Sequence, residues 1–293
     1  MNVLTKTSLV RLIKLEEELS LKNHIYAKIG AENPTGSIKD VTTFNMLEDY
    51  KNRGILVPNS VIIEATSGNT GISLSYFTKI FDYKAIIVMP TSMSKERREM
   101  IKKYGAELVL VEGGMKECNQ KAQELLKVYK NSFIFSQFDN PANYEAHYKY
   151  TGKEIYEDLP NVSYIFAGVG TGGTISGTGK FFKEHKLDTK MIGIEPLESP
   201  LITKGKAGPH KIQGIGANFI PNNFHIEYVD EVITVSGDSA IEFAKKVREL
   251  EGLDIGISSG AALLGAINYL NENNIISKDI VVICPDKGDR YSW

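Results

Sequence analysis

The sequence has few cysteines, no long hydrophobic run and no excess of either charge, and each shortage excludes a class of protein. Two cysteines among 293 residues are too few for a disulfide framework. No apolar run approaches the roughly 18 residues that a membrane span needs. The 34 basic and 36 acidic residues give a formal net charge of −2, which provides no global attraction for nucleic acid or anionic membranes.

The composition is instead that of a globular protein with a sizeable core. Hydrophobic residues make up 42% of the chain and charged residues 24%, so disorder is excluded. The first twenty residues mix charged and apolar side chains and lack the apolar core of a signal peptide, so a cytoplasmic location is expected. The five histidines are scattered without the pairing of a zinc site, and no metal is predicted.

Short β-branched runs alternate with amphipathic stretches along most of the chain. The predicted strands are 61–64, 85–89, 108–111, 133–135, 164–166, 191–194, 232–235 and 280–284. The predicted helices are 41–51, 72–80, 95–104, 115–129, 144–156, 239–249 and 261–270. The strands are compact and lack polar alternation, which is typical of parallel sheets covered on both faces. The pattern predicts an α/β protein.

Three glycine-rich junctions between predicted strands and helices could bind ligands. The first, NPTGSIKD at 33–40, places Lys39 where a helix begins. Most lone lysines are solvated surface charges. Here, however, the positive end of the helix dipole and partial burial would both lower the lysine's pKa. A lysine with a lowered pKa can form an imine or act as a catalytic base.

The second junction, EATSGNTGIS at 64–73, follows a predicted strand directly. Side-chain donors are offered by Thr66, Ser67, Asn69 and Thr70, and Gly68 lets a ligand approach the backbone. A helix cap would need only one of these side chains. Four in five consecutive positions favour a site for a carboxylate or another small anion.

The third junction, AGVGTGGTISGTG at 167–179, exposes successive amides before a helix and suits a phosphate. Gly168, Gly170 and Gly173 also satisfy the dinucleotide pattern GxGxxG, with Glu195 closing the next strand. An NAD-type oxidoreductase is therefore the competing interpretation of this junction, although it leaves the first two junctions without a role.

Two later segments add candidate contacts. GISSGAA at 256–262 places two hydroxyls before a helix start, where a cap needs one. The segment 197–223 is rich in Gly, Pro and Lys and is long for a connection without secondary structure. A functional loop and a mobile surface excursion are equally compatible with that composition.

Taken in order, these motifs resemble the cysteine synthase (O-acetylserine sulfhydrylase) and cystathionine β-synthase family of pyridoxal-phosphate enzymes, of fold type II. NPxxS[IV]KD, TSGNTG, QFDNPAN, GTGGT, IQGIGA and GISSGAA all occur, over essentially the whole chain. The resemblance implies a tryptophan synthase β-like fold of two α/β domains, each a mostly parallel twisted sheet flanked by helices, with pyridoxal 5'-phosphate in the cleft between them. It implies a smaller substrate-binding domain at 39–144 and a larger cofactor-binding domain formed by 1–38 and 145–293.

The resemblance also implies roles for individual residues. Lys39 would hold the cofactor as a Schiff base and serve as the catalytic residue, and Asn69 would contact the cofactor's phenolic oxygen. Ser258 would face the pyridine nitrogen, and the cofactor's phosphate would be bound by Gly170, Thr171, Gly172, Gly173 and Thr174. The substrate carboxylate would be held by Thr66, Ser67, Gly68, Thr70 and Gln137.

The implied reaction is β-replacement through an α-aminoacrylate intermediate, with O-acetylserine and sulfide giving cysteine. The resemblance also implies a homodimer and a serine acetyltransferase partner. The chain departs from the family pattern at Val41, where arginine is usual, at Tyr144, where proline is common, and at Asn218, where the sulfhydrylases have glycine. Because Asn218 would lie near the substrate, the alternatives are β-replacement on serine or cysteine, giving cystathionine or lanthionine or releasing hydrogen sulfide, and a catalytically silent relative.

Overall fold

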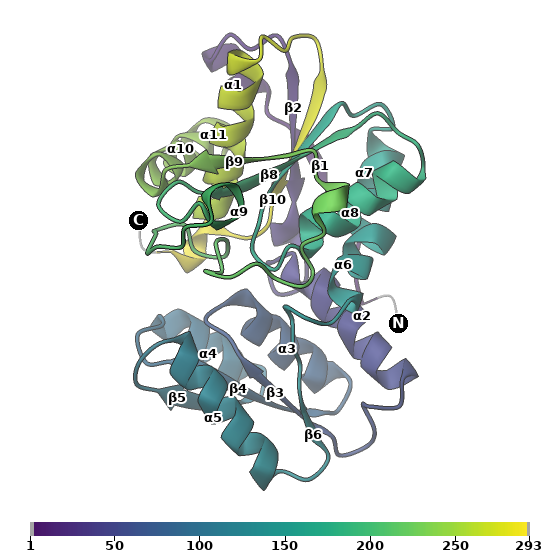
Figure 1. Cartoon of the computed structure of the whole chain (residues 1–293), viewed down its shortest axis with the longest axis vertical. Coiled ribbons are helices and arrows are strands. Elements are labelled where there is room, and N and C mark those ends of the chain that lie inside the picture. The colour runs from purple at the N-terminus through teal and green to yellow at the C-terminus, as the bar shows by residue number, and fades with distance from the viewer. Residues whose placement is uncertain (1–2, 292–293) are drawn as a thin grey trace. The chain divides into compact units, whose positions relative to one another are not determined.

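The computed structural model describes residues 3–291 and divides into two compact units. Unit 1 comprises the chain up to Ile38 together with the chain from Asn143 onward, and unit 2 comprises Lys39–Ala142. Each unit contains one sheet flanked by helices (Figure 1). All but one of the strand pairings are parallel, so the predicted α/β class is confirmed.

Unit 1 has a six-stranded sheet in the order β1-β2-β10-β7-β8-β9, in which only β1 is antiparallel. Its strands are β1 (Leu9–Arg11), β2 (His24–Ile29), β7 (Tyr164–Gly168), β8 (Lys190–Pro196), β9 (Glu231–Val235) and β10 (Asp279–Cys284). Its helices are α1 (Ile13–Glu18), α7 (Lys153–Asp158), α8 (Gly173–Glu184), α9 (Leu201–Lys204), α10 (Gly237–Glu251) and α11 (Ile257–Glu272). Helix α6 (Ala142–Ala146) begins at the last residue of unit 2.

Both faces of this sheet are buried, which explains why its strands lack polar alternation. On one face, Phe166 and Ile192 belong to the same core cluster as Ala261 and Leu263 of α11. On the other face, Ile165 belongs to the core cluster that includes Phe182 of α8. Successive residues of one strand therefore support helices on opposite sides of the sheet.

Unit 2 has a four-stranded parallel sheet in the order β5-β4-β3-β6. Its strands are β3 (Val61–Ala65), β4 (Lys84–Pro90), β5 (Glu107–Val111) and β6 (Ser132–Ile134). Its helices are α2 (Lys39–Asn52), α3 (Asn69–Ile80), α4 (Lys95–Lys103) and α5 (Met115–Val128). Because β3 and β6 are parallel neighbours, the loops that follow them begin at the same edge of the sheet.

The predicted strands are all present, with ends that differ by one or two residues. The helix predicted over 144–156 is interrupted by a π-helical segment, His147–Gly152, between α6 and α7. Strand β2 was missed because its sequence, HIYAKI, contains a lysine in a strand that is mostly buried. Within residues 3–291, no helix is long and apolar enough to cross a membrane.

Candidate active site

The polar loop of unit 2 connects β3 to α3. Strand β3 ends at Ala65, and α3 begins at Asn69 with Gly68 as its N-cap residue. The Thr66 hydroxyl accepts the Gly68 N–H at 3.3 Å, which shapes the turn. Ser67 is exposed, whereas Thr70 is buried on the first turn of the helix. The loop therefore presents hydroxyl groups and a helix N-terminus at one position, which suits a small anion.

Gln137 comes to the same place from the loop that follows β6. Its side-chain oxygen accepts a hydrogen bond from the Thr70 hydroxyl at 2.6 Å. Its amide nitrogen donates to Glu64 Oε1 at 3.0 Å. The structure thus brings together two of the residues predicted to hold a substrate carboxylate, although 67 positions separate them in the sequence. It also adds Glu64, for which the sequence analysis had no role.

Lys39 is the first residue of α2 and of unit 2, and it is half-buried. Ile38 immediately before it donates its N–H to the Pro285 carbonyl at 2.7 Å, and Ser37 forms a β-bridge with Asp286. The segment that leads into Lys39 is therefore held by the chain that follows β10. Lys39 therefore lies at a helix N-terminus directly after a firmly held segment, and its role as an imine-forming amine stays a prediction.

The glycine-rich loop of unit 1 follows β7 and ends where α8 begins. Gly172 is the N-cap residue and has a φ of 82°, in the left-handed region that favours glycine. A Cβ atom at Gly173 would lie 1.9 Å from Asn143 Oδ1, so the close approach of Asn143 also requires a glycine there. The Thr171 hydroxyl accepts the Gly173 N–H at 3.3 Å. Backbone N–H groups at this helix start, together with the threonine hydroxyls, fit a phosphate.

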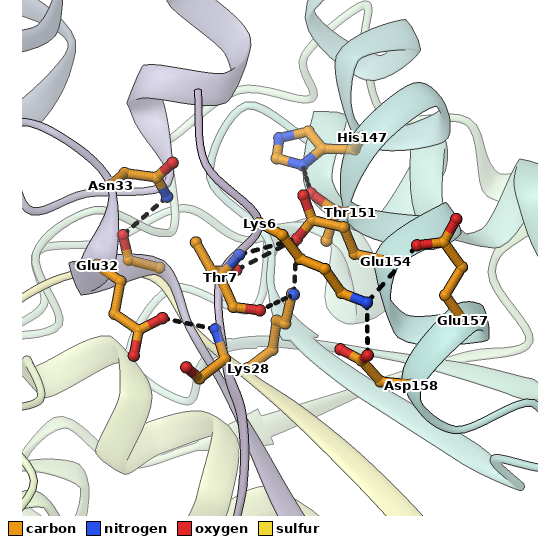
Figure 2. Close-up of polar contacts among 12 residues, drawn as sticks. Lys6, Thr7, Lys28, Glu32, Asn33, His147, Thr151, Glu154, Glu157 and Asp158 are labelled. Carbon is orange, nitrogen blue, oxygen red and sulfur yellow. Dashed lines mark hydrogen bonds and ion pairs between the residues drawn. The ribbon is translucent and has the colours of Figure 1, made fainter. Parts of the chain in front are cut away.

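A histidine that the sequence analysis did not select contacts this loop. His147 Nε2 lies 3.2 Å from the Thr174 hydroxyl, and His147 Nδ1 lies 2.9 Å from the Thr151 hydroxyl. His147 is buried and lies on the π-helical segment, together with Thr151. Figure 2 shows this pair together with Glu154, which contacts Lys28 and Thr7. The π-helical segment therefore contacts the start of α8 through His147 and leads directly into α7, which carries Glu154.

The remaining predicted cofactor residue in unit 1 is Ser258. It is the second residue of α11 and is buried, with Gly256 as the helix's N-cap residue. A Cβ atom at Gly256 would lie 2.3 Å from Asp286 Oδ1, so the first turn of α11 packs closely against the chain after β10. This packing fixes the start of the helix that carries Ser258.

Asn218 and Gly170 line the same pocket of unit 1, and Ser199 and Phe219 line it with them. Asn218 has a φ of 62°, in the left-handed region. Asparagine is among the few residues that adopt this region readily, which explains why it can stand where the family pattern has glycine. Its Oδ1 accepts a hydrogen bond from the Ser199 hydroxyl at 3.0 Å. The long loop 197–223 therefore places Asn218 beside Gly170, in the glycine-rich loop between β7 and α8.

Glu195, the residue that supported a dinucleotide site, has another role in the structure. Its carboxylate accepts the backbone N–H groups of Ile202 and Thr203 at 2.8 and 2.9 Å, and the Thr203 hydroxyl at 2.5 Å. The carboxylate therefore provides acceptors for backbone N–H groups in the first turn of α9, which have no partner within the helix. The dinucleotide interpretation of the loop after β7 loses the acidic residue on which it depended.

Comparison with known proteins identifies the family of the chain. The model of the family described as "Pyridoxal-phosphate dependent enzyme" matches residues 2–286. A cysteine synthase from Buchnera aphidicola is 47% identical over 92% of this chain and 87% of its own length. Cysteine synthase A from Escherichia coli is 43% identical over 97% of this chain and 90% of its own. A crystal structure of a hydrogen sulfide-producing enzyme from Fusobacterium nucleatum superposes with a TM-score of 0.95 and 40% identity, covering 99% of this chain and 96% of the other.

The chain belongs to the pyridoxal-phosphate dependent enzyme family, and within it to the group of the cysteine synthases. It is an enzyme that uses pyridoxal 5'-phosphate, so the family and the cofactor predicted from the motifs are confirmed. The loop after β7 fits the phosphate of that cofactor, because a left-handed glycine and a helix N-terminus occur together there.

Proposed function

We propose that the chain catalyses β-replacement on a serine-derived amino acid, with O-acetylserine and sulfide giving cysteine and acetate. The observation that carries the proposal is the grouping in unit 2 of Thr66, Thr70 and Gln137, which offers polar hydrogen-bonding groups for an amino-acid carboxylate at the start of α3. The cysteine synthases from Buchnera aphidicola and Escherichia coli support the choice of reaction, because their identity to this chain extends over nearly its whole length.

The cofactor's phosphate is assigned to unit 1 and the substrate carboxylate to unit 2. Gly170, Thr171, Gly172, Gly173 and Thr174 would bind the phosphate, with Ser258 at the pyridine nitrogen and Asn69 at the phenolic oxygen. Thr66, Ser67, Gly68, Thr70 and Gln137 would hold the carboxylate. On this assignment 39–144 is the substrate-binding domain, and 1–38 with 145–293 is the cofactor-binding domain.

Lys39 would hold the cofactor covalently. When bound, pyridoxal 5'-phosphate supplies an electron sink that lets a proton leave the amino acid's Cα. The Lys39 amine, at the start of α2, would be the base that takes that proton. Thr70 and Gln137 orient the substrate by its carboxylate. With that proton held by Lys39, the β-substituent would leave and the nucleophile would take its place at Cβ.

A second candidate differs in the donor and acceptor. Asn218 lines the pocket that also contains Gly170, and its amide adds a hydrogen-bonding group where the sulfhydrylases have glycine. Serine or cysteine could then serve as the donor, with homocysteine or cysteine as the acceptor, giving cystathionine or lanthionine or releasing hydrogen sulfide. The likeness to the Fusobacterium nucleatum hydrogen sulfide-producing enzyme supports this alternative.

The setting of the reaction belongs to the same proposal. We assign the enzyme to the cytoplasm as a homodimer, with serine acetyltransferase as a protein partner. The two cysteines, both buried and free, are consistent with a reducing compartment. The homodimer and the acetyltransferase rest on the family resemblance.

The two candidates are separated by measuring rates with O-acetylserine, serine and cysteine as donors and with sulfide, homocysteine and cysteine as acceptors. Sulfide should be the best acceptor with O-acetylserine. The informative variant is Asn218→Gly, which keeps the left-handed backbone available. The matched control is Asn274→Gly, since Asn274 is also left-handed, with a φ of 53°, and is exposed beyond α11. If sulfide is the poorest acceptor and only Asn218→Gly restores its use, the sulfhydrylase assignment fails.

A further inference from the structure

Unit 2 contains a buried carboxyl group that the proposed mechanism does not use. Glu64 lies in β3 with 3% of its surface exposed. Its Oε2 accepts the Ser136 N–H at 3.2 Å, and its Oε1 accepts the Gln137 amide nitrogen at 3.0 Å. Ser136 has a φ of 55°, in the left-handed region. The chain after β6 therefore turns around this carboxyl group, which fixes both the backbone and the side chain of Gln137.

The hydrogen bonds from Thr70 to Glu64 all run in one direction. The Thr70 hydroxyl donates to the Gln137 side-chain oxygen at 2.6 Å, and the Gln137 side-chain nitrogen donates to Glu64 at 3.0 Å. A hydroxyl has one proton, so in this arrangement the Thr70 oxygen offers lone pairs to a ligand. An ionised carboxylate can only accept hydrogen bonds. In this direction of the hydrogen bonds, the Thr70 oxygen would face the substrate carboxylate with lone pairs, which opposes carboxylate binding at Thr70.

We propose that Glu64 is a positioning residue whose protonated form a substrate carboxylate needs in order to bind at Thr70, so that binding takes up a proton from solvent wherever Glu64 is ionised, and that this proton reverses the chain of hydrogen bonds. Protonated Glu64 donates to the Gln137 oxygen after the amide turns over. The Gln137 nitrogen then donates to the Thr70 oxygen, and the Thr70 proton points to the substrate carboxylate. The inference rests on the proposed function, because it takes Thr70 and Gln137 as the carboxylate site.

The surroundings of Glu64 make this proton available near neutral pH. Burial raises the pKa of Glu64 to about 8, against the hydrogen bonds from Gln137 and Ser136. Asp139, in the loop after β6, raises it further through its charge. From α2, Glu64 faces Tyr50, a phenol whose pKa burial raises to about 12. On β4 the residue opposite Glu64 is the apolar Ile87.

The direct test is the binding of propionate to the holoenzyme, measured by calorimetry between about pH 7 and pH 9. Propionate has no amino group and does not titrate in this range. With a Glu64 pKa of about 8, the dissociation constant should be about tenfold higher at pH 9 than at pH 7. Repeating the titration near pH 8.2 in HEPES and in Tris measures proton uptake, which should be about half a proton or more per site.

The matching variant is Glu64→Gln, whose amide can donate to Gln137 and accept from Ser136 as protonated Glu64 would. Its propionate affinity at pH 9 should stay within about twofold of its value at pH 7. The control is Glu99→Gln on α4, because the Glu99 side chain is 65% exposed and should leave the wild-type pH dependence in place.

The outcomes separate this inference from the proposed function. If propionate binds with no proton uptake and with the same pH dependence in the wild type and Glu64→Gln, the inference is overturned and the carboxylate site stands. The wild-type proton uptake alone decides this point if Glu64→Gln does not fold. If the wild type binds no propionate, or binds it unchanged after Thr70→Val, the carboxylate site fails and the inference fails with it.

Discussion

Replacing Glu154 by glutamine should destabilise unit 1 far more than its position near the surface suggests. The Lys28 side chain is 2% exposed, and its ammonium donates to Glu154 Oε2 at 2.7 Å and to the Thr7 carbonyl at 2.6 Å (Figure 2). Glu154 is 18% exposed and also accepts the Thr7 N–H at 3.3 Å. Glu154→Gln keeps the shape and one acceptor but leaves the buried ammonium without its counter-charge.

The expected cost follows from that asymmetry. Removing one partner of a buried ion pair costs about 3–5 kcal/mol, and the retained acceptor and the partial exposure of Glu154 place this variant near 3 kcal/mol. Such a loss would lower the melting temperature by roughly 6–12 °C. The double variant Lys28→Met, Glu154→Gln should be more stable than Glu154→Gln alone, because it removes the buried charge as well as its partner.

Urea unfolding of the apo-protein, followed by circular dichroism, measures these free energies. The matched control is Asp158→Asn on the same helix, whose partner Lys6 is 45% exposed. An exposed pair of this kind contributes less than about 1 kcal/mol. The account is contradicted if Glu154→Gln is no more destabilising than Asp158→Asn. It is also contradicted if the double variant is less stable than Glu154→Gln alone.

Three further predictions concern the site. His147→Ala removes the contact with Thr174 and should weaken cofactor affinity about fivefold, measured by titrating the apo-enzyme with pyridoxal 5'-phosphate; an unchanged affinity would remove His147 from the site. Asn69→Ala and Thr70→Ala should each weaken substrate binding more than tenfold and leave the anchoring of the cofactor's phosphate largely intact; unaltered substrate affinity in both would reject the carboxylate loop. The pKa of Glu64 is about 8 in the folded protein, against an ordinary pKa of 4.5. The free energy of unfolding should therefore fall as the pH rises from about 4.5 to about 8, by at most about 1.4 kcal/mol per pH unit. A Glu64→Gln variant with the same slope would contradict this.

The parts of the fold that the sequence predicted are those in which local pattern and burial agree. Strands such as β10 are apolar on both faces, and both faces are buried. Strand β2 escaped prediction because the partners of the buried Lys28 ammonium are the Thr7 carbonyl and Glu154, and Glu154 is 126 positions away in the sequence. A lysine in a short run normally indicates solvent, and no local signal identifies its distant partner.

The candidate site likewise contains residues that local motifs predicted and residues that only the structure identified. The loop between β7 and α8 was recognised because glycine and hydroxyl residues at a strand–helix junction have a chemical reason to be there. Glu64 and His147 were missed because their importance lies in contacts made across the fold, with Gln137 and Thr174. Asn218 was singled out by its difference from relatives, but its left-handed backbone became visible only in the structure.

The most direct test of the central claim is to reduce the purified holoenzyme with borohydride and to identify the modified peptide by mass spectrometry. The assignment of Lys39 as the residue that holds the cofactor predicts a single modified peptide that contains Lys39. It also predicts that Lys39→Ala incorporates no cofactor on reduction. Modification of a different lysine, or a Lys39→Ala variant labelled as well as the wild type, would contradict the account.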